Sequence, residues 1–223
     1  MNYDNNNYSK NFITNPVEIE KKSFEIIAGL LKDKQPLGKN APIIQRVIHT
    51  TADFDYLDNL VFSENVLAQT REILKQGVHI VTDTKMVKAG INKKCLEQLN
   101  GSVHCFIDSD EVAEQAAIND MTRSAAAMEF AVRNIANPIL FAIGNAPTAL
   151  IKLYEMIQQG CCQPCLIIGV PVGFVNVTES KELIMELDVP FIVSRGRKGG
   201  SNVAAAIVNA ILYETIKFGE NRE

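Results

Sequence analysis

Short apolar runs alternate with longer amphipathic stretches from residue 78 onward. The runs have the length of strands and predict them at Val78–Val81, Val103–Ile107, Pro138–Ile143, Leu166–Val170 and Phe191–Val193. The amphipathic stretches predict helices at Asn92–Leu99, Asp110–Ile135 with a break near Asn119–Asp120, Pro147–Gln159, Glu179–Leu187 and Ser201–Lys217. This alternation favours right-handed crossovers and a mainly parallel sheet. Because the strands are apolar throughout, helices should cover both faces. The predicted fold class is therefore α/β, with a three-layer α/β/α arrangement and a Rossmann-like sheet.

The N-terminal part of the chain is patterned differently. Residues 1–13 are rich in Asn and lack apolar periodicity, which is typical of a flexible arm. Asn15-Pro16-Val17-Glu18 then has the pattern of a helix start, and apolar residues follow it at i, i+3, i+4 and i+7 from Phe24. Lys32 to Asn40 is polar and predicts a loop. No linker marks a second domain, so residues 14–223 are expected to form one domain.

Residues 43–77 are harder to assign from the pattern. Periodicity does not separate helix from strand over Ile43–Ile48, which runs into the polar segment His49-Thr50-Thr51-Ala52-Asp53. Further on, Ser63 has the position of a cap for a helix that ends at Gly77. Residues 82–86 are expected to be a loop.

Composition and charge narrow the functional class. The chain has 223 residues, 47% hydrophobic and 22% charged, so it can bury a core without disulfides or metal. A formal charge of −4 argues against general nucleic-acid binding. No apolar run is long enough to span a membrane, the N-terminus does not resemble a secretory signal, and the five cysteines are an odd number. These features predict a cytoplasmic protein with neither nucleic acid nor membrane as a partner.

Three Gly-containing loops are expected at the carboxyl ends of strands, where ligands of open α/β sheets bind. They are Gly144-Asn145-Ala146-Pro147-Thr148, Pro171-Val172-Gly173-Phe174 and Arg195-Gly196-Arg197-Lys198-Gly199-Gly200-Ser201. Each precedes a helix, whose free N–H groups favour an anion, and the third carries three cations. None has a nucleotide-binding phosphate-loop pattern, and Arg suits planar carboxylates. A polycarboxylate is the expected ligand, although plain turn chemistry is the alternative.

Two further positions are candidates for chemistry. His49 opens a polar segment after an apolar run, whereas His79 and His104 lie inside predicted strands, so His49 is the most suitable catalytic histidine. Arg123 begins a helix beside small residues and could bind a flat ligand or be a solvated surface residue. Cys161-Cys162-Gln163-Pro164-Cys165 lacks the second ligand pair of a zinc site, so no metal site is expected.

Taken together, several stretches resemble the precorrin-8X methylmutase family of cobalamin biosynthesis. They are NPVEI with Ser23-Phe24, RVIH at 46–49, DTKMV at 83–87 with Gly90, TRSAA at 122–126, GNAPTAL at 144–150, PVGFV at 171–175, ESK at 179–181 and RGRKGGS at 195–201. They run in family order over about residues 15–205. The segment TTADFD after His49 looks like the branch that handles cobalt.

The resemblance implies an isomerase that moves a methyl group from C-11 to C-12 of ring C of (cobalt-)precorrin-8. The product would be cobyrinate, or hydrogenobyrinate without cobalt. It implies a homodimer, His49 as the catalytic residue, Ser23 as a substrate contact and Arg123 as a carboxylate ligand. The full set of expected substrate-binding residues is Ser23, Thr50, Lys85, Arg123, Asn145, Arg195, Arg197 and Lys198.

The chemistry of such a shift agrees with these residues. A 1,5-sigmatropic methyl shift needs no cofactor from the protein, and any cobalt belongs to the substrate. A protonated His49 that donates to a ring nitrogen would act as a general acid. The acetate and propionate arms of the substrate would need the cations of the third loop. The alternative function is a non-catalytic corrinoid carrier or pathway scaffold.

Overall fold

The computed structural model describes residues 12–31, 38–136 and 138–220, and the chain divides into two compact units, residues 1–37 and 38–223. The first unit contains α1 (Pro16–Leu31). Its predicted cap is confirmed, because the Asn15 side-chain oxygen accepts the N–H groups of Val17 at 2.9 Å and Glu18 at 3.2 Å. The predicted arm lies almost wholly outside the described residues, as do residues 32–37 of the predicted loop.

The second unit contains all the strands of the described chain. Its elements are η1 (Gly38–Asn40), α2 (Ala41–Thr51), α3 (Tyr56–Asn59), β1 (Leu60–Phe62), α4 (Val66–Leu74), β2 (His79–Thr82), α5 (Lys85–Gly90), α6 (Lys93–Gln98), β3 (Ser102–His104), α7 (Asp110–Ile118), α8 (Arg123–Asn134), β4 (Ile139–Ile143), α9 (Pro147–Gln158), β5 (Leu166–Gly169), α10 (Val177–Met185), β6 (Phe191–Ser194) and α11 (Ser201–Glu220). The predicted alternation of strands and helices from residue 78 onward is confirmed.

Within the described residues, the strands form one sheet in the order β1-β6-β5-β4-β2-β3. The neighbours from β6 to β3 are parallel, and β1 pairs antiparallel with β6, with Val61 opposite Val193. The central strands β4 and β5 are buried along their whole length. This confirms that the strands are apolar because both faces are covered.

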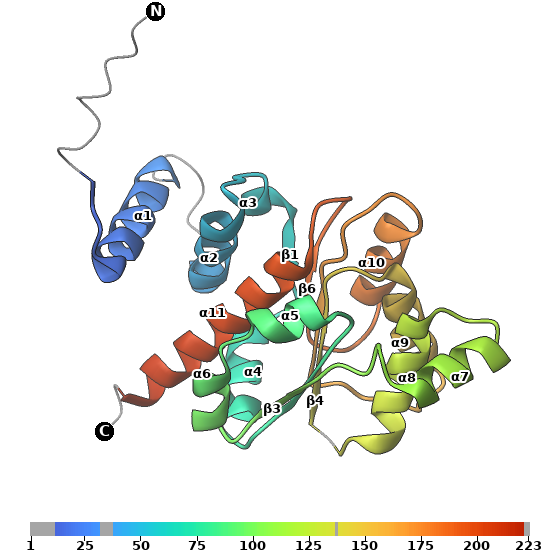
Figure 1. Ribbon diagram of the computed structural model, residues 1–223. Coiled ribbons are helices and arrows are strands. Elements are labelled where there is room, and N and C mark those ends of the chain that lie inside the picture. The colour runs from blue at the N-terminus through green and yellow to red at the C-terminus, as the bar shows by residue number, and fades with distance from the viewer. Residues whose placement is uncertain (1–11, 32–37, 137, 221–223) are drawn as a thin grey trace, which may run out of the picture. The chain divides into compact units, whose positions relative to one another are not determined.

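Helices lie on both sides of this sheet (Figure 1). On one side, α11 packs against α2, α4, α5 and α6, and on the other α9 packs between α8 and α10. The core on the α9 side joins Phe141 and Ile143 of the sheet to Leu150 and Leu153 of α9. The expected three-layer α/β/α arrangement with a mainly parallel sheet is confirmed.

The strand order places a topological switch between β2 and β4. The chain leaves β2 toward β3 at one edge of the sheet, but it leaves β4 toward β5 and β6 in the other direction. The connections after β2 and β4 therefore diverge at their carboxyl ends, which is where open α/β sheets form a ligand crevice. A ligand site is therefore expected beside the residues just after Thr82 and Ile143.

Three local predictions need correction or completion. The ambiguous segment 43–48 is helical, since Ile43, Ile44, Val47 and Ile48 form the buried face of α2. Ser63 does not cap α4: Asn65 holds that position without a side-chain bond, and the Ser63 hydroxyl instead accepts the N–H of Phe191 at 2.9 Å. The predicted loop 82–86 is shorter than expected, because Thr84 caps α5 by accepting the Val87 N–H at 3.1 Å.

Candidate functional site

The three Gly-containing loops meet at one edge of the sheet, as predicted. They follow β4, β5 and β6, which are parallel neighbours, so their carboxyl ends share an edge. The backbone joins them further, because Gly200 N–H donates to the Val170 carbonyl at 2.8 Å. A Cβ added at Gly144 would lie 2.7 Å from Ser201 Cα, so the first loop packs directly on the start of α11. We call this edge the carboxyl edge.

Asp83 fills the switch point between β2 and β4. It is 1% exposed, and its carboxylate accepts the N–H groups of Gly144 at 2.9 Å, Asn145 at 2.7 Å and Ala146 at 2.7 Å. Burial raises the pKa of Asp83, while these N–H bonds oppose the shift. An internal carboxylate therefore already binds the N–H groups of the three loop residues that precede α9.

The second loop presents apolar side chains to solvent. Phe174 is 83% exposed, and Val172 and Val175 are also exposed. The loop contacts the third loop through a bond from Gly173 N–H to the Arg197 carbonyl at 3.3 Å. The Arg197 guanidinium also lies 5.8 Å from the centre of the Phe174 ring, within the range of a cation–π contact. The two loops thus combine an apolar surface with a cation.

The other two cations of the third loop are ion-paired. Lys198 Nζ lies 2.5 Å from Asp53 and 2.6 Å from Asp55, and Arg195 Nε lies 3.0 Å from Glu182. The carboxylates raise the pKa of Lys198, and the hydrogen bond from Lys198 is the main cause that lowers the pKa of Asp53. All three cationic side chains are exposed, so water screens these pairs and a ligand can reach them.

His49 lies in the last turn of α2, not in a loop. Val47 and Ile48 face the core, while His49 and Thr50 are exposed. The helix ends at Thr51, and the next residue, Ala52, has a φ of 53° and turns the chain toward Asp53. Because Asp53 binds Lys198, the segment that follows His49 is tied to the third loop. The structure therefore links the predicted catalytic histidine to the predicted basic loop through the ion pairs of Lys198 with Asp53 and Asp55.

The remaining predicted residues of the second unit lie near this edge. Arg123 opens α8 and is exposed, and its neighbour Thr122 bonds to Thr148 of the first loop at 2.7 Å. The Asn145 side chain is also exposed. Lys85 begins α5 and its Nζ lies 2.6 Å from Asp108. Ser23 belongs to α1 in the other unit, where its hydroxyl donates to the Ile19 carbonyl at 2.8 Å.

Two functional candidates were not singled out from the sequence: Asp83 and Lys181. Lys181 is fully buried on α10, and burial lowers the pKa of its ammonium group to about 8. A signal was present, because Lys181 occupies a position of the buried stripe that runs from Val177 to Ile184. Asp83 stands in the stretch DTKMV, but nothing near it along the chain indicated its burial, since its partners are more than sixty residues away.

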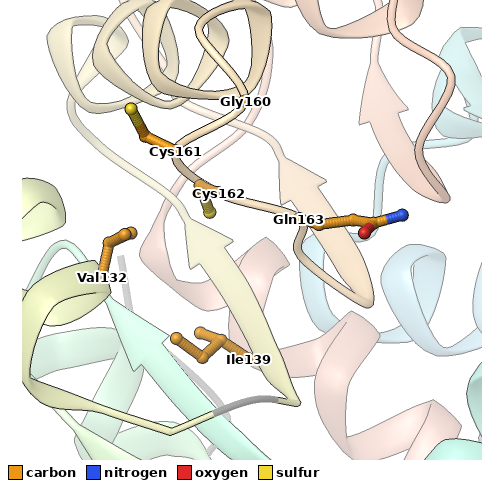
Figure 2. Close-up of a pocket in the computed structure, with 6 residues that line it drawn as sticks. All are labelled: Val132, Ile139, Gly160, Cys161, Cys162 and Gln163. Atoms are coloured by element: carbon orange, nitrogen blue, oxygen red, sulfur yellow. The ribbon is translucent and has the colours of Figure 1, made fainter.

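A cavity of about 220 Å³ lies at the opposite, amino edge of the sheet. It is lined by Val132, Ile139, Gly160, Cys161, Cys162 and Gln163 (Figure 2). Burial raises the pKa of Cys162 to about 11 and that of Cys165 to about 12, so both remain neutral thiols at neutral pH. In the described ranges, no group of three or more His, Cys, Asp or Glu residues is arranged to hold a metal. This cavity therefore lacks the cations and histidine of the carboxyl edge.

Comparisons with known proteins agree with this geometry. A family profile described as precorrin-8X methylmutase matches residues 18–214. The chain is 44% identical over 209 residues to a cobalt-precorrin-8 methylmutase of Salmonella typhimurium, a match that covers 91% of this chain and 97% of that protein. It is 39% identical over 190 residues to a precorrin-8X methylmutase of Pseudomonas aeruginosa, covering 84% and 88%.

A solved structure supports the same grouping. The precorrin-8X methyl mutase of Thermus thermophilus matches with a TM-score of 0.82 and 34% identity, over 90% of this chain and 98% of that one.

Among the described helices, none is long and apolar enough to cross a membrane.

Proposed function

The chain belongs to the precorrin-8X methylmutase family, and on that premise we propose that it is an isomerase of cobalamin biosynthesis. The reaction breaks the bond between a methyl group and C-11 of the macrocycle and forms a bond from that methyl group to C-12. The family match over residues 18–214 carries this proposal. The relatives are named as mutases, which supports catalysis over the alternative of a corrinoid carrier.

The substrate is cobalt-precorrin-8. Relatives of this name from Salmonella typhimurium and Priestia megaterium are 44% and 41% identical to the chain. The cobalt is part of the substrate, and the shift is an isomerisation without net oxidation or reduction, so the protein supplies no cofactor. Its contribution is to bind the macrocycle, orient it and donate a proton.

His49 is the catalytic acid in this proposal. Its exposed position at the end of α2 leaves the imidazole accessible to a ligand at the carboxyl edge. When protonated, the ring can donate to a nitrogen of the macrocycle and withdraw electron density from the migrating centre. Thr50, the exposed neighbour, lies on the same turn and is a substrate contact.

The carboxylate arms of the substrate bind to the exposed cations. Arg197 and Lys198 are the main partners, with Arg195, Arg123 and Lys85 around them. Lys198, Arg195 and Lys85 are paired with acidic side chains, and water screens these exposed pairs, so each contributes little to stability. Exchanging them for substrate carboxylates therefore costs little. Asn145 adds a polar contact, and Phe174 offers an apolar surface to the flat macrocycle.

The protein acts in the cytoplasm as a homodimer. The resemblance to the family supports the homodimer, and the odd number of cysteines and the polar N-terminal sequence support the cytoplasm. Light scattering on the purified full chain tests the dimer, which predicts twice the mass of the 24.6 kDa chain.

The decisive experiment incubates the protein separately with cobalt-loaded and metal-free precorrin-8. We expect the absorbance spectrum to change as the product forms. The product should have an unchanged mass, and NMR should place its methyl group at C-12. It should form faster from the cobalt-loaded compound than from the metal-free one. Binding without spectral conversion would instead support a carrier. Faster conversion of the metal-free compound would overturn the cobalt assignment alone.

A further inference from the structure

The loop 195–198 folds around the ammonium group of Lys181. Nζ donates to the Gly196 carbonyl at 2.6 Å, to the Lys198 carbonyl at 2.9 Å and to Ser194 Oγ at 3.3 Å. Ser194 Oγ in turn donates to the same Lys198 carbonyl at 2.7 Å. The three donors of the buried ammonium are thus matched by three oxygen acceptors from one short segment.

This arrangement determines which groups of the loop face solvent. The carbonyls of Gly196 and Lys198 bind Lys181, and the carbonyl between them, that of Arg197, accepts the N–H of Gly173. The side chains of Arg195, Arg197 and Lys198 are exposed. The loop therefore keeps its negative carbonyl ends inside the protein and presents its positive side chains outside.

A buried lysine at this position lowers the stability of the fold unless its ammonium group has compensating partners. Moving an ammonium group out of water carries a large penalty, and an apolar residue would continue the buried stripe of α10 without it. The partners of Lys181 are carbonyl and hydroxyl oxygens, so the charge is balanced by loop dipoles. Its loss would remove the donor to the Gly196 carbonyl and leave the Lys198 carbonyl with the Ser194 hydroxyl, so the Gly196 carbonyl would turn toward water and the loop would relax.

We propose that Lys181 is a positioning residue for the methyl shift: its ammonium holds loop 195–198 in the conformation that presents Arg197 and Lys198 to the carboxylate arms of the substrate. The proposal rests on the proposed function for its ligand. Lys181 does not touch the substrate. Its loss should therefore weaken the binding of substrate and transition state equally, which raises KM and leaves kcat nearly unchanged.

The test compares Lys181→Met and Lys181→Arg with the wild type and with Lys152→Met. Met has a similar length without the charge, and Arg restores the charge and the donors. Lys152 on α9 is the matched control, because it binds Glu129 and Glu155 but does not contact the loop. We expect Lys181→Met to raise KM for cobalt-precorrin-8 about tenfold while kcat changes less than about threefold. Lys181→Arg should recover part of the KM change, and Lys152→Met should leave KM unchanged.

Hydrogen exchange gives a readout that does not depend on turnover. In Lys181→Met, amides 195–200 should exchange faster, whereas those of 144–146 should not. Unchanged KM and unchanged exchange in a folded Lys181→Met would overturn the proposal, as would a fall in kcat alone. If Lys181→Met does not fold, Lys181→Arg is compared with an Arg197→Ala variant. A folded Lys181→Arg whose KM and loop exchange are changed as much as those of Arg197→Ala would overturn the proposal. Failure of the wild type to convert precursor would overturn the proposed function, while the exchange result would still report on the loop.

Discussion

Two loops at the carboxyl edge are held by buried charges of opposite sign. Beneath loop 144–146 lies Asp83, whose carboxylate accepts three backbone N–H groups. Beneath loop 195–198 lies Lys181, whose ammonium donates to two backbone carbonyls and a hydroxyl. One loop therefore turns its donors inward, and the other turns its acceptors inward.

The difference explains what each loop can offer to a ligand. The N–H groups of residues 144–146 lie just before a helix, where an anion is favoured, but Asp83 already accepts all three of them. In the third loop the carbonyls of residues 196–198 are bound inside the protein and the cationic side chains are exposed, so the loop retains the capacity to bind anions. A Gly-rich loop before a helix is thus not sufficient evidence for an anion site, since the protein itself can supply the anion.

The largest effect is expected at a residue that belongs to neither loop. His49→Ala should lower kcat by about 10²–10⁴-fold, the range for loss of a general acid, with both anchors intact. Turnover of cobalt-precorrin-8 measures the loss, and circular dichroism checks the fold. Conversion at the wild-type rate would show that His49 is not the catalytic acid.

The anchor of the first loop should matter chiefly for stability. In Asp83→Asn, the amide nitrogen cannot accept a hydrogen bond, so at least one buried N–H group of residues 144–146 loses its partner. The free energy of unfolding should fall by about 1–3 kcal/mol, measured by urea denaturation. Asp108→Asn is the control, because Asp108 is exposed and water screens its pair with Lys85, so this variant should lose much less stability. Equal losses in the two variants would contradict the role of Asp83.

The raised pKa of Asp83 predicts a specific pH dependence. Between the ordinary value of 3.8 and the raised value, the folded state binds more protons than the unfolded state. The contribution of Asp83 to stability is therefore fully present below the ordinary pKa and is lost as pH rises through the raised one, by at most about 1.4 kcal/mol per pH unit. Subtracting the urea stability of Asp83→Asn from that of the wild type at each pH should isolate this fall. A difference that is flat or rises with pH would exclude it.

The cations of the third loop should differ from one another. Arg197 lies over Phe174, while Arg195 is held by Glu182 away from that ring. Arg197→Ala should raise KM for cobalt-precorrin-8 about tenfold, and Arg195→Ala less than about threefold. Steady-state kinetics on both variants measures this. Equal changes would mean that the loop acts as a diffuse positive surface.

The smallest effect is expected at the amino edge. Cys161 is exposed and lines the cavity there, far along the strands from both anchored loops. Cys161→Ser should change the free energy of unfolding by less than about 0.5 kcal/mol and leave KM and kcat unchanged. A measurable loss of turnover would show that the contrast between the two edges is wrong.

The sequence by itself determined most of the architecture. Periodicity predicted the strands and helices from residue 78 onward, and the apolar strands predicted helices on both faces. Asn15 marked the start of α1, and the order of the elements brought three loops to one edge. These features depend on neighbours within a few residues, which the chain displays directly. The same limit explains the failures over residues 43–63, where α2 was ambiguous and Ser63 bonds to Phe191 instead of capping a helix.

Only the tertiary structure decided how the site is built. Asp83 meets residues 144–146 across the switch point, Lys198 binds Asp53, and Lys181 binds the loop after β6. Each of these charges lies far along the chain from at least one partner. A buried charge is tolerated only where its partners surround it, and those partners come together only when the strands pair. The pattern of residues therefore indicates which charged groups are present, but the fold decides which of them hold a loop and which remain available to a ligand.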